Sequence, residues 1–191
     1  MALSRVGVRE RIASLTEETE EARICNLHYD LALTSALALH PWPFASKRKA
    51  LTLIEEKPSI EWAFRYALPI DCIEPLYIEG AARNLPIESR PRWELEADSS
   101  ADRTTLLADV PNAVLKYTSR SVSEASFPPY FVPVMSWMLA DFIAIPLTVK
   151  AEVSTAVATQ LARALSTAKA HASNQGQADE ALDSEFIRAR T

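Results

Sequence analysis

The hydrophobic pattern changes twice along this 191-residue chain, and these changes limit the folds that it can adopt. Toward both ends, apolar residues recur at the three- and four-residue spacing of a helix. Residues 60–120 instead hold short runs of aromatic and β-branched residues bounded by Pro, Asp, Asn and Ser, which predict antiparallel strands over 70–79, 92–97, 103–108 and 113–119. This order predicts an α+β fold, a mostly helical bundle with a small inserted antiparallel β-sheet. We expect the bundle to comprise residues 1–60 and 127–176, the inserted β-sheet region residues 61–126, and a polar C-terminal tail residues 177–191.

Four helices are expected outside this middle region. "SLTE" at 14–17 has the form of a capping box and predicts a helix over 16–39. A second helix is expected over 44–55, with "SKRK" at 46–49 as its solvated first turn. The other two are expected over 128–147, which Pro146 closes, and over 148–172.

The stretch "HPWPFASKR" at 40–48 concentrates rigid apolar groups at one corner. Pro41 and Pro43 fix the backbone φ angle, so Trp42 and Phe44 have few alternative positions. We expect this corner to hold two consecutive helices at a set angle and to bury its aromatic rings between them. Farther along the chain, we expect Leu68, Pro69 and Asp71 at the junction with the sheet, where an aspartate at a strand start usually accepts hydrogen bonds from nearby backbone N–H groups.

Composition excludes several classes of protein. The chain has three glycines, too few for the phosphate loops of nucleotide-binding enzymes. Its net charge of −5 and its lack of a dense Lys/Arg block argue against an electrostatic grip on nucleic acid. Two cysteines make no disulfide framework, which favours a cytoplasmic origin. The most apolar stretch, 131–147, is interrupted by two prolines and an aspartate, so we expect no membrane role.

A search for chemistry assigns no catalytic, cofactor-binding or metal-ligating residue. Cys25 and His28 share a helix face, but no second pair completes a zinc site, which favours simple packing. No sequence motif pairs a histidine with a nucleophile. An acid–base pair of Glu55 and Glu61 stays possible, but nothing distinguishes these two residues from ordinary surface charges. Five aromatic residues alternate with charges in the sheet region; they suggest sugar or nucleic-acid binding less strongly than cross-strand packing. They are Trp62, Phe64, Tyr66, Trp93 and Tyr117.

Three stretches in order carry a resemblance to a known family. They are "EARICNLHYDLALTSALALHPWPFASKRKAL" at 21–51, "WAFRYALPIDCIEPLYI" at 62–78 and "FPPYFVPVMSWMLADFIAIPLT" at 127–148. Together they resemble the tail tubular protein A family, the head-to-tail adaptor or gatekeeper proteins of short-tailed bacteriophages. The resemblance covers about residues 20–190. It departs from the family at the start, where "MALSRVGVRERIASL" leaves little space for the helix that family members carry before this segment.

The resemblance implies a structural protein of the virion tail or neck, assembled in the host cytoplasm and without enzymatic activity or cofactor. It implies a dodecameric ring that lies between the portal protein and the tail nozzle protein, contacts no membrane and lets DNA pass without sequence-specific binding. We expect structural or interface roles for ten residues: Trp42, Phe44, Leu68, Pro69, Asp71, Phe127, Phe131, Trp137, Phe186 and Ile187.

Elementary physical arguments fit such a ring. Rotating one subunit into a ring requires two different surfaces that fit each other. The helical stretches 31–39 and 134–145 are apolar nearly all round and need more cover than one chain of this size readily gives. Twelve copies at −5 each carry a net charge of −60, and an acidic channel wall repels DNA and favours its sliding.

Two other functions stay open. A tail-associated peptidoglycan hydrolase would need a carboxylate pair in a cleft. A small DNA-binding packaging subunit would need a helix-turn-helix and a basic face, and neither is evident in the sequence.

Overall fold

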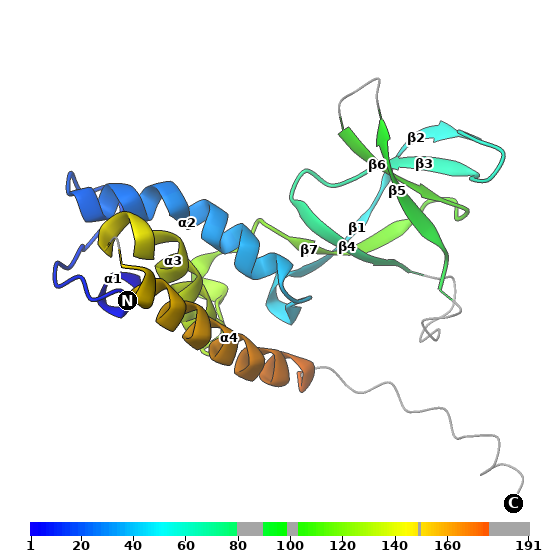
Figure 1. The fold of residues 1–191 in the computed structure, drawn as a ribbon. Coiled ribbons are helices and arrows are strands. Elements are labelled where there is room, and N and C mark those ends of the chain that lie inside the picture. Colours follow the sequence, from blue (N-terminus) through cyan, green and yellow to red (C-terminus); the bar gives the residue numbers. More distant parts are fainter. Residues whose placement is uncertain (80–89, 99–102, 149, 176–191) are drawn as a thin grey trace, which may run out of the picture.

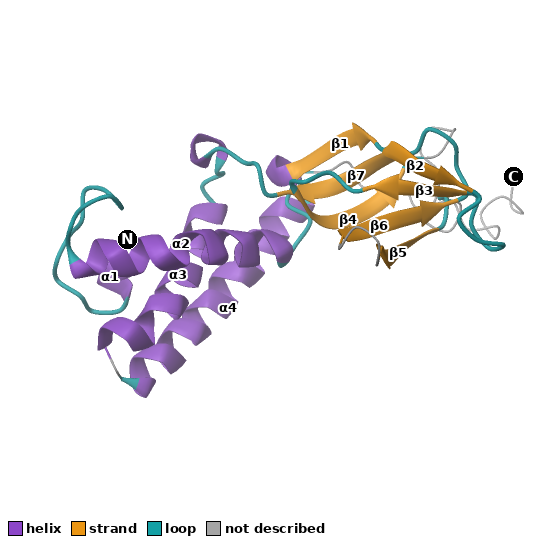
Figure 2. Ribbon diagram, turned by 90° about the horizontal axis from the view of Figure 1, so that it is seen from above, coloured by secondary structure: helices purple, strands orange, loops and turns teal. Residues whose placement is uncertain are grey.

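The computed structural model describes residues 1–79, 90–98, 103–148 and 150–175. In these residues the helices gather in one part of the molecule and the strands in the other (Figures 1 and 2). The helices are α1 (Ala2–Arg5), α2 (Glu20–Ala38), α3 (Phe131–Thr148) and α4 (Ala151–Ser173). The strands are β1 (Ser46–Ala50), β2 (Thr52–Glu56), β3 (Phe64–Ala67), β4 (Cys72–Ile78), β5 (Trp93–Asp98), β6 (Arg103–Ala108) and β7 (Val114–Ser119). The predicted α+β class is confirmed, but the strands form two antiparallel sheets rather than one.

Helix α2 begins about one turn later than predicted. The Thr19 hydroxyl accepts a hydrogen bond from the Ala22 N–H at 3.2 Å and so caps the helix. The expected capping box exists only in part, because the Glu17 carboxylate accepts from the Ser14 N–H at 2.9 Å but no helix starts there. The chain therefore uses Thr19 as the N-cap, and the negative charge of Glu20 in the first turn also favours a helix N-terminus.

Helix α3 is the centre of the helical part, since it packs against α1, α2 and α4. The helices predicted over 128–147 and 148–172 are both confirmed within a few residues. Pro133 lies in the first turn of α3 and Pro146 lies inside the helix near its end. Neither proline breaks the helix, which continues for two residues past Pro146. By length and composition alone α3 could cross a membrane, but the core helix of an ordinary globular protein meets the same criteria.

The helix predicted over 44–55 is wrong. After a short 3₁₀ turn, Pro43–Ala45, the chain forms β1 and β2, so "SKRK" is a strand rather than a solvated helical turn. Strand β1 pairs with β7, with Lys47 opposite Tyr117, and strand β2 pairs with β3. These residues favour helix locally, and the available pairing partners override that preference. The strands thus begin at residue 46, inside the range expected for the helical bundle.

The strands predicted over 70–79, 92–97, 103–108 and 113–119 are confirmed as β4, β5, β6 and β7. The three-stranded sheet has the order β1-β7-β4, and the four-stranded sheet has the order β2-β3-β6-β5. Because β2 follows β1 after Leu51, one extended segment runs from the first sheet into the second (Figure 2). Both sheets contribute to one hydrophobic core, with Tyr66 and Leu106 from the larger sheet and Leu115 and Tyr117 from the smaller.

Candidate assembly interface

The aromatic corner predicted at 40–48 exists, but it connects different elements. Trp42 is fully buried, and its indole N–H donates to the Ala36 carbonyl in the last turn of α2 at 2.9 Å. Its ring centroid lies 5.1 Å from that of Phe131, the first residue of α3. Phe44 and Phe127 also pack on Phe131, with centroids 4.7 Å and 5.1 Å away. The corner therefore fixes the end of α2 on the start of α3, inside the subunit.

Asp71 lies at the junction between helices and sheets, where the sequence placed it, but its partners differ from those expected. Its carboxylate accepts from the Ser119 hydroxyl at 2.7 Å, the Tyr117 hydroxyl at 3.0 Å and the Lys47 ammonium at 3.2 Å. These are side chains of β7 and β1 rather than nearby backbone N–H groups. The Ser119 hydrogen bond is the largest cause that lowers the pKa of Asp71 to about 2, with Lys47 and Tyr117 adding to it. The Asp71 carboxylate thus ties three strands together at one end of the smaller sheet.

Leu68 and Pro69, three and two residues before this aspartate, shape the same turn. Leu68 packs against the core of the sheets, and the Pro69 carbonyl accepts from the Cys72 N–H at 2.9 Å, which closes the turn into β4. Ile70, between Pro69 and Asp71, is fully exposed. The turn therefore holds Asp71 inward while it presents an isoleucine to solvent.

An ion pair connects this turn to α2. The Asp71 carbonyl accepts from the Arg120 N–H at 2.8 Å, and the Arg120 guanidinium binds the Asp30 carboxylate. Beside Asp30, Leu27 and Leu31 lie one turn apart on the outward face of α2 and are 75% and 52% exposed. Single exposed apolar residues are common, but two leucines one turn apart on one exposed helix face suggest a contact surface. We call Leu27 and Leu31 the α2 edge.

A second apolar surface lies on the larger sheet. Strand β2 is an edge strand of that sheet and is exposed along its whole length. Leu53 and Ile54 of this strand are 44% and 36% exposed, and Ile60, in the loop that follows, is fully exposed. An exposed edge strand also offers unpaired backbone N–H and C=O groups to a neighbouring molecule. We call Leu53, Ile54 and Ile60 the β2 edge.

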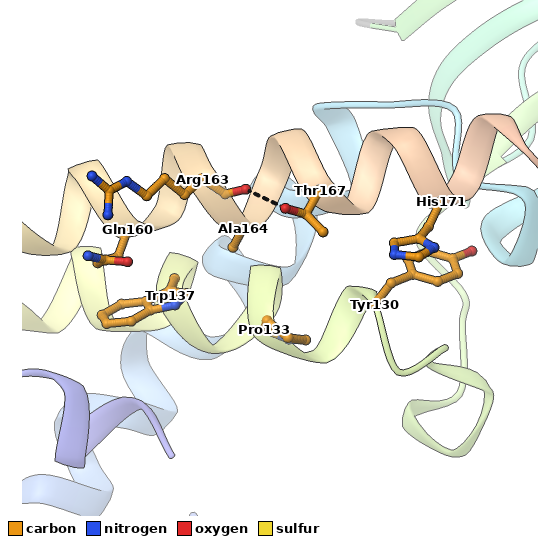
Figure 3. Close-up of a pocket in the computed structure, with 8 residues that line it drawn as sticks. All are labelled: Tyr130, Pro133, Trp137, Gln160, Arg163, Ala164, Thr167 and His171. Atoms are coloured by element: carbon orange, nitrogen blue, oxygen red, sulfur yellow. Dashed lines mark hydrogen bonds between the residues drawn. The ribbon is translucent and has the colours of Figure 1, made fainter.

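A groove between α3 and α4 contains Trp137, the remaining predicted interface residue that the structure describes (Figure 3). The indole is half-buried, and the guanidinium of Arg5 lies 4.0 Å from its ring centroid. At the other end of the groove, Tyr130 stacks on His171 with centroids 6.1 Å apart. Trp137 is therefore partly open to a ligand, unlike Trp42.

The weaker candidates for chemistry have ordinary partners. Cys25 is buried, while His28 stacks on Phe142 with centroids 6.1 Å apart. No group of three or more potential metal ligands occurs among the described residues. Glu55 pairs with Arg65 at 3.3 Å, whereas Glu61 is exposed.

Four of the five sheet aromatics belong to the sheet core or pack against it, as the packing interpretation predicts. These four are Phe64, Tyr66, Trp93 and Tyr117. Trp62 is buried beneath the Arg92 guanidinium, which lies 4.7 Å from its ring centroid.

Of the eight predicted interface residues that the structure describes, Trp42, Pro69 and Phe131 are buried and the other five are half-buried. Trp42 and Phe131 are fully buried, so they form no part of an exposed surface. The sequence prediction did not include Leu27 and Leu31, although two leucines four residues apart beside the polar residues Asn26, His28 and Asp30 were a visible signal. The predicted residues Phe186 and Ile187 lie outside the described residues.

No model of a known protein family matches the chain, and a search of curated proteins finds no match either. The function of the chain is therefore a matter of proposal.

Proposed function

We propose that this protein is the subunit of a head-to-tail adaptor ring of a short-tailed bacteriophage, a structural virion protein without enzymatic activity. Twelve copies would form a ring between the portal protein and the tail nozzle protein, and DNA would pass through it. The observation that carries the proposal is the pair of separate apolar surfaces, the α2 edge and the β2 edge, on one chain. The sequence resemblance to the tail tubular protein A family supports the same function.

A closed ring needs two different surfaces on each subunit, because each copy contacts its neighbours head to tail. The α2 edge and the β2 edge are different in kind, one a helix face and the other a sheet margin. In the proposed ring, the α2 edge of one subunit packs on the β2 edge of the next. Burying these side chains stabilises the contact by removing apolar area from water.

The interior of the subunit supports this arrangement. The Asp30 and Arg120 side chains join α2 to the end of β7, and Ile73 of β4 packs against the core of the helical part. A ring interface that spans both parts requires such fixed geometry, since a loose joint would add an ordering cost at every contact.

Variants of the two surfaces test the proposal. Leu27→Gln with Leu31→Gln alters the α2 edge without changing charge or helix propensity much. Leu53→Thr with Ile54→Thr alters the β2 edge and places residues that favour strands there. Each variant is co-expressed with the portal protein of the same genome, and ring formation is followed by electron microscopy. We expect rings from the unaltered chain and from the matched control Asn26→Gln, an exposed polar position beside Leu27, and none from either double variant.

Mixing the two double variants gives a sharper result. The intact β2 edge of one variant fits the intact α2 edge of the other, so the mixture should stop at a one-to-one complex. Rings in the mixture, or rings from either variant alone, would contradict the proposed contact. Failure of the unaltered chain to assemble with the portal would contradict the adaptor function itself.

A further inference from the structure

Two edge strands of the sheets carry opposite charges. Strand β1 is one edge of the smaller sheet and has the sequence Ser-Lys-Arg-Lys-Ala. Strand β5 is one edge of the larger sheet and has the sequence Trp-Glu-Leu-Glu-Ala-Asp. Residues 47–50 and 94–97 of these strands are exposed, and the two strands lie at opposite margins of the strand-bearing part (Figure 2). The outer side of an edge strand presents backbone N–H and C=O groups that can pair with another chain.

We propose that β1 of one copy pairs with β5 of a second copy, in antiparallel orientation and with Lys49 opposite Glu94. This contact is separate from the contact between the α2 edge and the β2 edge. Its test needs no portal protein, so the inference does not depend on the proposed function.

The charges repeat with the same spacing on the two strands. Lys47 and Lys49 lie on one side of β1, because side chains alternate along a strand, and Glu94 and Glu96 share one side of β5 for the same reason. The antiparallel register that places Lys49 opposite Glu94 also places Lys47 opposite Glu96. Oppositely charged side chains in directly opposed positions stabilise a pair of strands. Two such pairs therefore fall on one side of the joined strands.

The charges that lack a partner favour this register over a parallel one. Lys49 and Glu94 form no ion pair with any residue that the structure describes. Lys47 and Glu96, in contrast, each have an ion-pair partner within the subunit. The antiparallel register brings Lys49 and Glu94 together, whereas a parallel register would place each of them opposite a residue that is already paired.

The other side of β5 presents apolar surface to the same neighbour. Leu95 is 40% exposed, although its partner across the sheet, Leu106, is fully buried. In the proposed register Leu95 lies opposite Arg48, and the aliphatic stem of an arginine can cover an apolar side chain. Pairing of the two strands would therefore also remove apolar area from water.

The same charges oppose the pairing of each strand with its own copy. Two β1 strands would bring lysine and arginine side chains together, and two β5 strands would bring glutamates together. Like charges in directly opposed positions destabilise a pair of strands, and lysines on edge strands commonly prevent such self-pairing. Of these three combinations, charge favours β1 with β5, which joins copies head to tail.

Disulfide trapping between two singly substituted chains tests the proposal. In a background of Cys25→Ala and Cys72→Ala, one chain carries Ser46→Cys and a second, isotopically labelled chain carries Ala97→Cys. These uncharged positions lie opposite each other in the proposed register. Each chain has a single cysteine, so a disulfide forms only between copies. The control partner carries Ala162→Cys, at an exposed position on α4, and mass spectrometry separates mixed from like dimers after mild oxidation.

We expect the Ser46→Cys chain to react several-fold faster with the Ala97→Cys chain than with the control chain or with itself. Lys49→Glu in the first chain should slow this reaction roughly fivefold, and Glu94→Lys in the second chain should restore the rate. A reaction no faster than the control would overturn the proposal. A faster reaction between Ala50→Cys and Ala97→Cys would overturn the antiparallel register, because these two positions face each other when the strands are parallel.

Discussion

Truncation of Trp42 to alanine tests the structural role of the aromatic corner. The side chain is fully buried among the rings of His40, Phe44 and Phe131, and its indole N–H donates to the Ala36 carbonyl. Because Ala36 lies in the last turn of α2, its carbonyl is among those that have no partner within a helix. The substitution therefore removes both ring packing and a helix-end hydrogen bond.

The expected loss of stability is large. Truncating a buried tryptophan to alanine costs about 3–5 kcal/mol through lost burial and the cavity left behind. The lost hydrogen bond contributes about 1 kcal/mol of its own, so the loss should fall toward the upper part of that range. For a chain of this size, each 1 kcal/mol lowers the melting temperature by about 2–4 °C. We expect a decrease of roughly 8–16 °C for a loss of about 4 kcal/mol.

Urea unfolding followed by helical circular dichroism, together with calorimetry, measures this change. Trp42→Phe is the control, since it keeps an aromatic ring and loses the indole N–H; we expect it to cost only about 1–2 kcal/mol. A melting temperature of Trp42→Ala within error of the unaltered chain would refute the assignment of this residue to the corner.

Three further predictions concern other buried or half-buried groups. The carboxylate of Asp71 has a pKa lowered to about 2 from 3.8, so its stabilising effect is present above about pH 4 and is lost as the pH falls through 2. The difference in free energy of unfolding between the unaltered chain and Asp71→Asn, measured in urea, should therefore shrink over that range, and a constant difference would contradict the contacts. Burial raises the pKa of the Cys72 thiol to about 11 and also raises the pKa of Cys25. Both thiols should therefore react with iodoacetamide at pH 7.5 far more slowly in the folded than in the unfolded protein, and mass spectrometry measures these rates. Thr118 is fully buried and its hydroxyl has no hydrogen-bond partner in the described structure. Thr118→Val should leave the free energy of unfolding in urea unchanged or raise it by about 1 kcal/mol, and a clear decrease would contradict the absence of a partner.

The long helices could be predicted because their apolar spacing persists over many residues. Helices α3 and α4 have this property, and Pro133 and Pro146 lie near the ends of α3. The start of α2 was less certain because Ser14 and Thr19 both offer a capping side chain within five residues. Only the packing of the following residues decides between two such caps.

Strands β1 to β3 could not be predicted, for a physical reason. Residues 46–56 contain lysine, arginine, alanine and glutamate, which favour helix in isolation. They become strands because β7 and β3 pair with them across long sequence separations, as in the pairing of Lys47 with Tyr117. Strand β3 is only four residues long, too short to give a clear alternating pattern.

The candidate surfaces were hidden for a related reason. The sequence singled out Trp42 by its place between two prolines and Phe131 through the family resemblance, but large aromatic residues are more often core than contact. Asp71 was placed correctly at the junction, but its partners Ser119 and Lys47 come from strands that a single sequence does not bring together. The α2 edge depends on which face of α2 the helix α3 covers, and that is a tertiary property.

The mass and symmetry of the particles that the chain forms with the portal protein test the proposed ring. The full chain is mixed with purified portal rings of the same genome, and the complexes are examined by electron microscopy and native mass spectrometry. We expect a closed ring of twelve copies seated on the portal, with the α2 edge of each copy against the β2 edge of the next. A chain that stays monomeric beside the portal would contradict it.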